Sequence, residues 1–418
     1  MKKRISLLIS CCLFSAFLFS QDCLPAAYRT KAYVPLLKGK RVAVFANQTA
    51  TIGQTHLVDS LLKLGIHIVK VFGPEHGFRG VTDDGAKIDN YTDEKTGLPI
   101  ISLYGAKNKP SVDDLKDVDI MLYDIQDVGT RFYTFIASMQ RYLEAALENS
   151  IPLIILDRPN PNGFYVDGPV LDTAFKSFVG LQPIPSVYGL TIGEYARMIA
   201  GEQWLSSKAA NEKYQYYLHA KNTKDTAFHF LVIKCDNYTH KTKYQLPIAP
   251  SPNIPDMSCV YWYASNCLFE GTILSEGRGT DHPFCTFGHP SLPKDLFAFT
   301  PTSRPGAKEP KLKNQVCYGW NLYHANPEDA LKEINNRIQL KYLLEAYRLF
   351  PDKETFFLKN KPKNGKTSYS INRLAGNDEL VQQIISGKTE EEIRASWQPK
   401  LNAYKIIRKK YLLYKDFE

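Results

Sequence analysis

The stretch from Val71 to Gly80 places an acid, an imidazole and a guanidinium directly after an apolar run. Gly73 and Pro74 must end that run as a strand, because proline has no N–H to donate and restricts the residue before it. Glu75 and His76 should therefore lie in a turn at the carboxyl end of a strand, the edge where open α/β sheets bind ligands. A carboxylic acid there can protonate a leaving group, and a neighbouring imidazole can orient it or relay protons.

Other apolar runs of strand type also end in polar side chains. After the runs 41–46, 118–123 and 151–156 come, in turn, Asn47, then Asp124, Asp127 and Arg131, then Asp157, Asn160 and Asn162. Because the carboxyl ends of parallel strands meet at one edge of a sheet, we expect these side chains to share a cleft with Glu75, His76 and Arg79. Asp124 or Asp127 could supply a second carboxylate, and the others are assigned to substrate binding.

A later stretch resembles the first one, with glycines beside an acid, an arginine and a hydroxyl. It contains Glu276, Arg278 and Thr280, which we also assign to substrate binding. The alternative is a tight turn with an internal pair between Glu276 and Arg278, since such pairs are common and weak when exposed.

A cleft rich in carboxylates, hydroxyls, amides and arginines is suited to cleavage of a glycosidic bond. The leaving oxygen needs a proton, and the developing oxocarbenium ion needs a negative partner. If the sugar carries a 2-acetamido group, its carbonyl can instead be the nucleophile, with the aspartate stabilising it. Arg79, Arg131 and Arg278 suggest an anionic group on the ligand, because arginine binds carboxylates through two parallel hydrogen bonds.

Several other chemistries lack their motifs. No G-x-G-x-x-G follows the first strand, and the chain has no phosphate-binding G-x-x-x-x-G-K-[ST], no G-x-S-x-G and no H-E-x-x-H. We therefore predict no cofactor and no metal. The net charge of +9 falls to +6 when Lys2, Lys3 and Arg4 are removed with a leader, which is not typical of a nucleic-acid-binding protein.

The first 21 residues have the pattern of a secretory signal, with Lys2, Lys3 and Arg4 preceding the apolar run 5–19. We expect a secreted, periplasmic protein with no transmembrane segment after cleavage. Lipoprotein anchoring at Cys11 is the less favoured alternative, because it leaves almost no apolar region before the cysteine. The six cysteines that follow the leader could be buried thiols or form one or two bridges in an exported compartment.

The remaining pattern predicts an α/β fold. Strand-type runs alternate with helical patterns, as in 133–148, so we expect a Rossmann-like parallel sheet without the nucleotide fingerprint over 22–245. The stiff segment Pro250–Pro255 suits a crossing to a smaller C-terminal α/β domain, 246–418, that completes the cleft. Two capping boxes, Thr191 with Glu194 and 389–392, predict helix starts.

Four stretches together resemble one known family. Gly73–Gly80, Asp124–Arg131, Asp157–Pro161 and Glu276–Thr280 are similar to the exo-acting β-N-acetylmuramidases long described as DUF1343, now glycoside hydrolase family 171. The resemblance implies release of terminal N-acetylmuramic acid from the non-reducing end of peptidoglycan fragments. It also implies a cleft between a Rossmann-like domain and a smaller C-terminal domain, with Glu75 as the central catalytic residue. The lactyl carboxylate of the muramyl sugar would be the anion that the arginines bind.

Two alternatives remain open from the sequence. One is a metal-dependent deacetylase or esterase acting on the same wall material through Asp83, Asp84 and His76. The other is a non-catalytic protein whose cleft binds a muramyl sugar without cutting it. The sequence leaves the oligomeric state, the stereochemistry and the second catalytic group undetermined.

Overall fold

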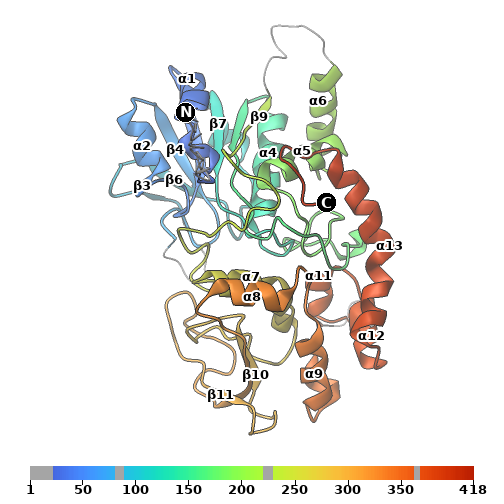
Figure 1. Cartoon of the computed structure of the whole chain (residues 1–418). Coiled ribbons are helices and arrows are strands. Elements are labelled where there is room, and N and C mark those ends of the chain that lie inside the picture. The colour runs from blue at the N-terminus through green and yellow to red at the C-terminus, as the bar shows by residue number, and fades with distance from the viewer. Residues whose placement is uncertain (1–21, 81–88, 220–228, 362–367) are drawn as a thin grey trace, which may run out of the picture.

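The computed structural model describes residues 22–80, 89–219, 229–361 and 368–418. These residues form a sheet domain, with helices on both faces of the sheet, and a smaller domain that carries a second sheet (Figure 1). The predicted leader lies outside the described residues. None of the described helices is both long and apolar enough to cross a membrane.

The large sheet has seven strands in the order β5-β6-β4-β1-β7-β8-β9. Their bounds, in that order, are Tyr91–Thr92, Pro99–Ser102, Ile68–Gly73, Val42–Ala46, Ile120–Asp124, Leu153–Leu156 and Phe230–Ile233. All neighbours are parallel except β5 and β6. The predicted Rossmann-like parallel sheet is therefore confirmed. The strand order reverses at β1, which is where such sheets bind ligands.

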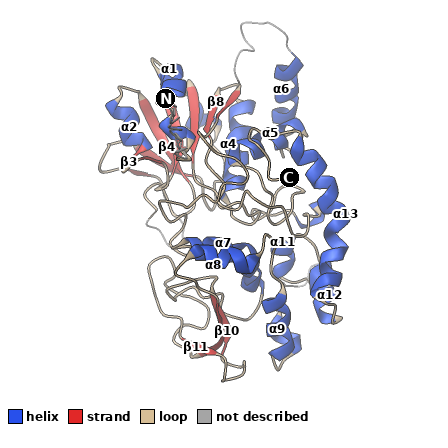
Figure 2. Ribbon diagram, in the orientation of Figure 1, coloured by secondary structure: helices blue, strands red, loops and turns tan. Residues whose placement is uncertain are grey.

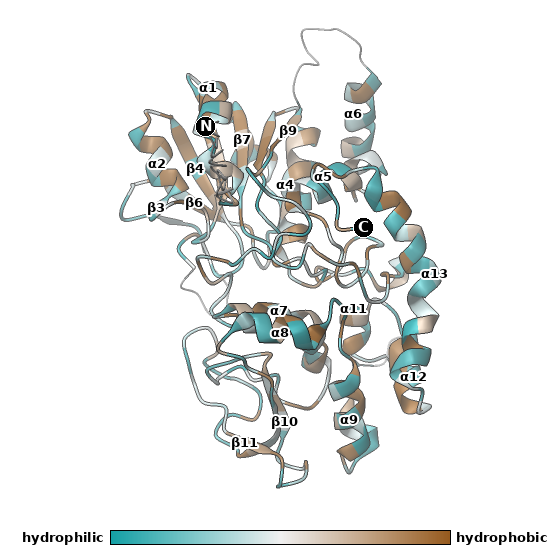
Figure 3. Ribbon diagram, in the orientation of Figure 1, coloured by the Kyte–Doolittle hydropathy of each residue, from teal (hydrophilic) through white to brown (hydrophobic). Residues whose placement is uncertain are grey.

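Alternation along β1 explains why helices cover both faces. Ala43 and Phe45 belong to one buried cluster, whereas Val42 and Val44 belong to the other. Because successive side chains of a strand point to opposite faces, a strand buried on both sides is apolar throughout. Figure 3 shows these strands in the brown of apolar residues.

The helices of this domain divide between the two apolar clusters. Side chains of α1 and α2 join one cluster, and those of α4 and α5 join the other. Figure 2 shows α2 on one side of the strands and α4 and α5 on the other. Their bounds, with those of α3 and α6, are α1 Thr30–Leu37, α2 Leu57–Lys63, α3 Val112–Leu115, α4 Phe135–Glu148, α5 Ile192–Gly201 and α6 Lys208–His219. The predicted capping box at Thr191 and Glu194 is present at the start of α5. A two-stranded hairpin, β2 (Thr51–Ile52) with β3 (Thr55–His56), precedes α2.

The second domain has a three-stranded antiparallel sheet surrounded by helices. Its strands, in the order β10-β12-β11, are Thr286–His289, Cys317–Asn321 and Phe297–Phe299. The helices are α7 Met257–Asn266, α8 Pro327–Ile334, α9 Lys341–Leu349, α10 Lys353–Phe356, α11 Ile371–Ala375, α12 Glu379–Ile385 and α13 Glu390–Lys409. The capping box predicted at 389–392 starts α13. The smaller α/β domain is thus confirmed, while the exact boundary near 245 stays a prediction.

The C-terminus returns to the first domain. Helix α13 runs from beside α12 toward α5 (Figure 1). The Nε of Arg408, near the end of α13, donates to the carbonyl of Gly189 at 2.8 Å, and Arg408 is fully buried. The hydroxyl of Tyr414 donates to Asp157 Oδ2 at 2.6 Å. The last residues of the chain therefore complete the first domain.

Candidate active site

The turn after β4 presents the two side chains that the sequence singled out. Gly73 ends the strand, and the N–H of Gly77 donates to the carbonyl of Pro74 at 2.9 Å to close a turn. His76 has a φ of +66°, a conformation that is uncommon for residues other than glycine and that recurs at functional sites. Glu75 is half-buried and His76 is buried. The predicted turn at the carboxyl end of a strand is confirmed.

These two side chains line a pocket of about 330 Å³ between the domains. The connecting segment contributes Ser251, Asn253 and Ile254, and the second domain contributes Glu270. Aromatic side chains make up most of the remaining wall: Tyr104, Phe132, Tyr133, Phe135, Phe178, Tyr263 and Phe284. Aromatic faces with a few polar groups are usual in small-molecule sites, and the volume lies near the lower end of their range of about 300–1,000 Å³.

Hydrogen bonds orient both polar residues of the turn. The hydroxyl of Thr134, just before α4, donates to Glu75 Oε2 at 3.1 Å. Ser251 Oγ lies 3.3 Å from His76 Nε2, so the connecting segment contacts the turn directly. The hydroxyl of Tyr133 donates to the carbonyl of Pro250 at 2.8 Å and secures that segment from the other side. The pocket wall is therefore built from both sides of the domain crossing.

Glu270 is a second carboxylate in this pocket, and sequence reasoning did not select it. It lies in the short 3-10 helix Cys267–Gly271 after α7, where neither a strand end nor a motif marks it. Arg278 Nη2 lies 2.7 Å from Glu270 Oε1, and Arg278 Nη1 lies 3.0 Å from Glu276 Oε1. The arginine thus joins a pocket carboxylate to a buried one behind it.

Glu276 is part of the support for this group. Its carboxylate is buried and lies 3.0 Å from Lys311 Nζ. Burial alone would raise the pKa of Glu276, but Lys311 and Arg278 hold it below the usual value. Thr280 donates its hydroxyl to the carbonyl of Gly277 at 2.7 Å and does not line the pocket. The internal Glu–Arg pair that the sequence left as an alternative is therefore present.

Asp124 and Asp127 are buried behind the pocket and do not line it. Asp124 is bound bidentately by Arg158, with Nε–Oδ1 and Nη2–Oδ2 distances of 2.5 and 2.8 Å. Asp127 accepts hydrogen bonds from the hydroxyl of Tyr188 and from the N–H of Gly129. Burial raises the pKa of Asp127 to about 6 despite these donors. In this geometry both aspartates stabilise the fold of the first domain, and neither faces the pocket as the predicted second catalytic carboxylate.

The three asparagines assigned to substrate binding form hydrogen bonds within the protein instead. Asn160 Nδ2 donates to the carbonyl of Leu190 at 2.7 Å, and Asn162 Nδ2 donates to that of Val128 at 2.9 Å. Asn47 Oδ1 accepts the N–H and the hydroxyl of Thr49. All three asparagines are buried, and none of them lines the pocket.

Asp157 connects β8 to α5 and to the C-terminus. Its Oδ1 accepts the N–H of Gly193 at 2.9 Å, and its Oδ2 accepts the hydroxyls of Thr191 and Tyr414 at 2.7 and 2.6 Å. Burial raises the pKa of Asp157 to about 7. Between about pH 4 and pH 7 the folded protein therefore holds a proton that the unfolded chain has released, so this group lowers the free energy of unfolding as pH rises.

We expect Asp157→Asn to remove this contribution. An asparagine keeps an acceptor for Gly193 and can donate to the two hydroxyl oxygens, which can rotate to accept. As pH rises across that window, the free energy of unfolding of the wild-type protein should fall relative to that of the variant by up to about 1.4 kcal/mol per pH unit. Denaturant unfolding at a series of pH values from 4 to 8 measures the difference. If the free energy of unfolding depended on pH in the same way for both proteins, the raised pKa of Asp157 would be contradicted.

The three arginines expected to bind an anion are not brought together. Arg131 is buried, and its guanidinium donates to the carbonyls of Pro169, Ile184 and Leu374 at 2.6–2.8 Å. Because Leu374 belongs to α11, this arginine fastens the two domains to each other. Burial lowers the pKa of Arg131 to about 9. Among the contacts of the described residues, Arg278 is the one arginine of these three that pairs with a carboxylate of the pocket wall, that of Glu270.

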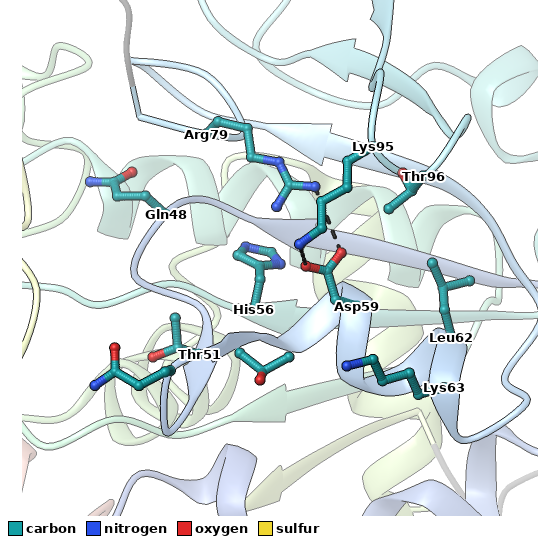
Figure 4. A pocket seen from close by; sticks show the side chains of 11 residues that line it. Gln48, Thr51, His56, Asp59, Leu62, Lys63, Arg79, Lys95 and Thr96 are labelled. Carbon is teal, nitrogen blue, oxygen red and sulfur yellow. Dashed lines mark hydrogen bonds and ion pairs between the residues drawn. The ribbon is translucent and has the colours of Figure 1, made fainter.

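Arg79 lines a different pocket, of about 650 Å³, beside α2 (Figure 4). It binds Asp93 bidentately at 3.1 and 2.8 Å and lies 3.7 Å from Asp59 Oδ1. Lys95 also pairs with Asp59, as the dashed lines show. Asp83 and Asp84, the residues of the metal-dependent alternative, lie outside the described residues.

Comparisons with known proteins agree with the two-domain architecture. Two family models match the chain: the N-terminal part of exo-β-N-acetylmuramidase NamZ over residues 42–258 and its C-terminal part over residues 261–414. The peptidoglycan β-N-acetylmuramidase NamZ of Bacillus subtilis is 35% identical over 404 residues, which cover 91% of this chain and 89% of that protein.

Two crystal structures of DUF1343 family proteins from Bacteroides fragilis have the same fold. One is 44% identical with a TM-score of 0.80, covering 95% of this chain and all of that one. The other is 27% identical with a TM-score of 0.73, covering 94% and 99% of the two chains. The resemblance found in four sequence motifs is thus confirmed over nearly the whole chain. The chain belongs to the NamZ family of exo-β-N-acetylmuramidases.

Proposed function

We propose that this protein is an exo-β-N-acetylmuramidase that releases terminal N-acetylmuramic acid from the non-reducing end of peptidoglycan fragments. The supporting observation is the 330 Å³ pocket in which Glu75 and His76 of one domain face a space shared with Glu270 of the other. Cleavage of a glycosidic bond needs a proton donor and a negative partner, and two carboxylates in one pocket meet that need. The name of the Bacillus subtilis relative supports the same substrate.

The size of the pocket supports exo action. A volume of about 330 Å³ is suited to one sugar residue and not to several rings of a glycan chain. Its aromatic walls offer apolar faces for the C–H side of a sugar ring. Glu75, held by Thr134, is the proposed proton donor, and His76, in contact with Ser251, is proposed to orient the substrate or relay protons.

The test is hydrolysis of para-nitrophenyl β-N-acetylmuramide by the purified protein, beside the N-acetylglucosamine analogue. We expect chromophore release that is selective for the muramide, because the Arg278 guanidinium, which contacts Glu270 of the pocket wall, can pair with its lactyl carboxylate. Release of acetate without release of chromophore would instead favour the deacetylase. Saturable binding of the muramide by calorimetry, with no product of either kind, would favour the wall-binding protein.

Glu270 is proposed as the second carboxylate of the reaction. We expect Glu270→Gln to lower kcat on the aryl muramide by about 10²-fold or more, because the amide keeps the size of the side chain and loses its charge. Glu379→Gln, which changes an exposed glutamate at the start of α12, is the matched control and should leave kcat unchanged. Equal rates for the two variants would remove Glu270 from the mechanism.

We also propose that the protein acts after export. The basic residues and apolar run of the first 21 residues support this, as does a substrate that lies in the cell wall. N-terminal sequencing of the protein recovered from fractionated cells tests it. A mature chain that begins near Gln21 in the exported fraction is the expected result, and an uncleaved chain in the cytosol is the result that would overturn it.

A further inference from the structure

Four potential metal ligands of the second domain come together away from Glu75 and His76. Asp256 caps the N-terminus of α7, and Cys259 lies in the first turn of that helix. His282 and Cys285 lie three residues apart in the loop just before β10. The sequence pairs them as D-x-x-C and H-x-x-C, the short spacing common in zinc sites.

Three distances between neighbouring ligand atoms fit edges of a tetrahedron. Cys259 Sγ lies 3.6 Å from Asp256 Oδ2 and 3.7 Å from Cys285 Sγ, and His282 Nδ1 lies 3.4 Å from Asp256 Oδ2. The ligand atoms of Asp256, Cys259 and His282 all lie within 4.8 Å of one another, and Cys285 adjoins this trio through its contact with Cys259. With zinc bonds of about 2.3 Å to sulfur and 2.0–2.1 Å to nitrogen or oxygen, tetrahedral ligands are roughly 3.3–3.8 Å apart.

The backbone arranges each pair of ligands separately. Asp256 Oδ1 accepts the N–H of Cys259 at 2.9 Å, which leaves Oδ2 for another partner. The N–H of Cys285 donates to the carbonyl of His282 at 3.1 Å and closes a tight turn. Within that turn Phe284 has a φ of +65°, a strained conformation that persists only when its surroundings require it.

Burial and packing also suit a bound cation. Both cysteines are fully buried, whereas the side chains of Asp256 and His282 are 33% and 29% exposed, so one side of the group is open for entry. The ring of Tyr323 stacks on that of His282 with centroids 3.5 Å apart and holds the imidazole in place.

We propose that Asp256, Cys259, His282 and Cys285 bind a divalent cation of the zinc class in a structural site. Two thiolates, an imidazole and a carboxylate form a ligand set that favours Zn²⁺ over Mg²⁺ or Ca²⁺. A disulfide between the cysteines would use neither the carboxylate nor the imidazole. On binding, each coordinated thiol releases its proton to solvent.

The site would stiffen the wall of the proposed active pocket without taking part in the reaction. Ile254 and Phe284 line that pocket, and each lies within two residues of a proposed ligand. The cation would therefore tie the start of α7 to the turn 282–285 and hold both wall residues in position. The proposal does not depend on what the pocket cleaves.

The test uses the full-length protein, purified under reducing conditions, stripped with a chelator and reconstituted with Zn²⁺ or Co²⁺ alone. We expect one equivalent of zinc per chain by elemental analysis after desalting. The cobalt form should show thiolate-to-cobalt charge transfer and the intense visible bands of tetrahedral Co²⁺. Cys259→Ser and Cys285→Ser should reduce the bound zinc to near zero. Cys317→Ser, which changes a buried cysteine of β12 outside the group, is the matched control and should keep the full equivalent.

Thermal unfolding provides a second measurement. Zinc should raise the melting temperature of the stripped wild-type protein and of Cys317→Ser, because a ligand that binds the folded state stabilises it. If a cysteine variant fails to fold, the cobalt spectrum of the wild-type protein still shows whether cysteine thiolates bind the metal. A wild-type protein that keeps no zinc and gives no charge-transfer band overturns the proposal. A Cys259–Cys285 disulfide found quantitatively in unreduced native protein overturns it as well.

Discussion

Glu75→Gln is expected to lower kcat on an aryl β-N-acetylmuramide by about 10²–10⁴-fold, the usual contribution of a general acid. Glutamine keeps the size of the side chain and can still accept the hydrogen bond that Thr134 donates to Oε2 at 3.1 Å. Its amide N–H is too weakly acidic to protonate the leaving oxygen. The loss should therefore appear in kcat, with KM and the melting temperature close to those of the wild-type protein.

Two further measurements separate this role from a structural one. A substrate with a very good leaving group needs less protonation, so the variant should recover activity on it relative to a poor leaving group. Thr134→Val removes the hydrogen bond to Glu75 while leaving the carboxyl in place, and its effect should be smaller. Near wild-type rates for Glu75→Gln on every substrate would exclude Glu75 as the acid.

The buried pair of Asp124 and Arg158 is the site where a single substitution should cost the most stability. Both side chains are at least 97% buried and joined by two hydrogen bonds of 2.5 and 2.8 Å. Asp124→Asn changes the shape very little but leaves the guanidinium buried without its counter-charge. The expected loss in the free energy of unfolding is about 3–5 kcal/mol.

Denaturant unfolding followed by tryptophan fluorescence measures this loss. Asp119→Asn breaks the exposed pair with Arg41 and is the control, with a much smaller expected effect because solvent screens that pair. The double variant Asp124→Leu with Arg158→Met should recover much of the stability, since a buried ion pair can often be replaced by apolar side chains of similar volume. Equal losses for Asp124→Asn and Asp119→Asn would show that burial does not govern the pair.

Much of the fold could be predicted because its signals are local. Strands β4, β7 and β8 of the large sheet are short apolar runs that end at or just before a glycine or an acidic residue, and both predicted capping boxes are visible within four residues. The turn that presents Glu75 follows from Gly73 and Pro74 alone. Such features depend on neighbours in the sequence, so the sequence shows them directly.

The roles of individual polar residues were harder to predict because their partners are distant in the chain. Asp124, Asp157 and Arg131 follow strands just as Glu75 does, yet their partners include Arg158, Tyr414 and the carbonyl of Leu374. A strand end places a side chain at the correct edge of the sheet but does not determine whether it faces the pocket or the core. Glu270 and the four proposed cation ligands Asp256, Cys259, His282 and Cys285 do not follow a predicted strand, so no such pattern marks them in the sequence.

The hydrogen bonds between Asp157 and Tyr414 and between Arg408 and Gly189 also bear on biosynthesis. A ribosome releases the N-terminal part of a chain first, and domains often fold as they emerge. Here the first domain acquires its last internal partners only when the final residues are made. A nascent chain that lacks them leaves a buried carboxylate short of donors, so the first domain should finish folding only after Tyr414 has left the ribosome.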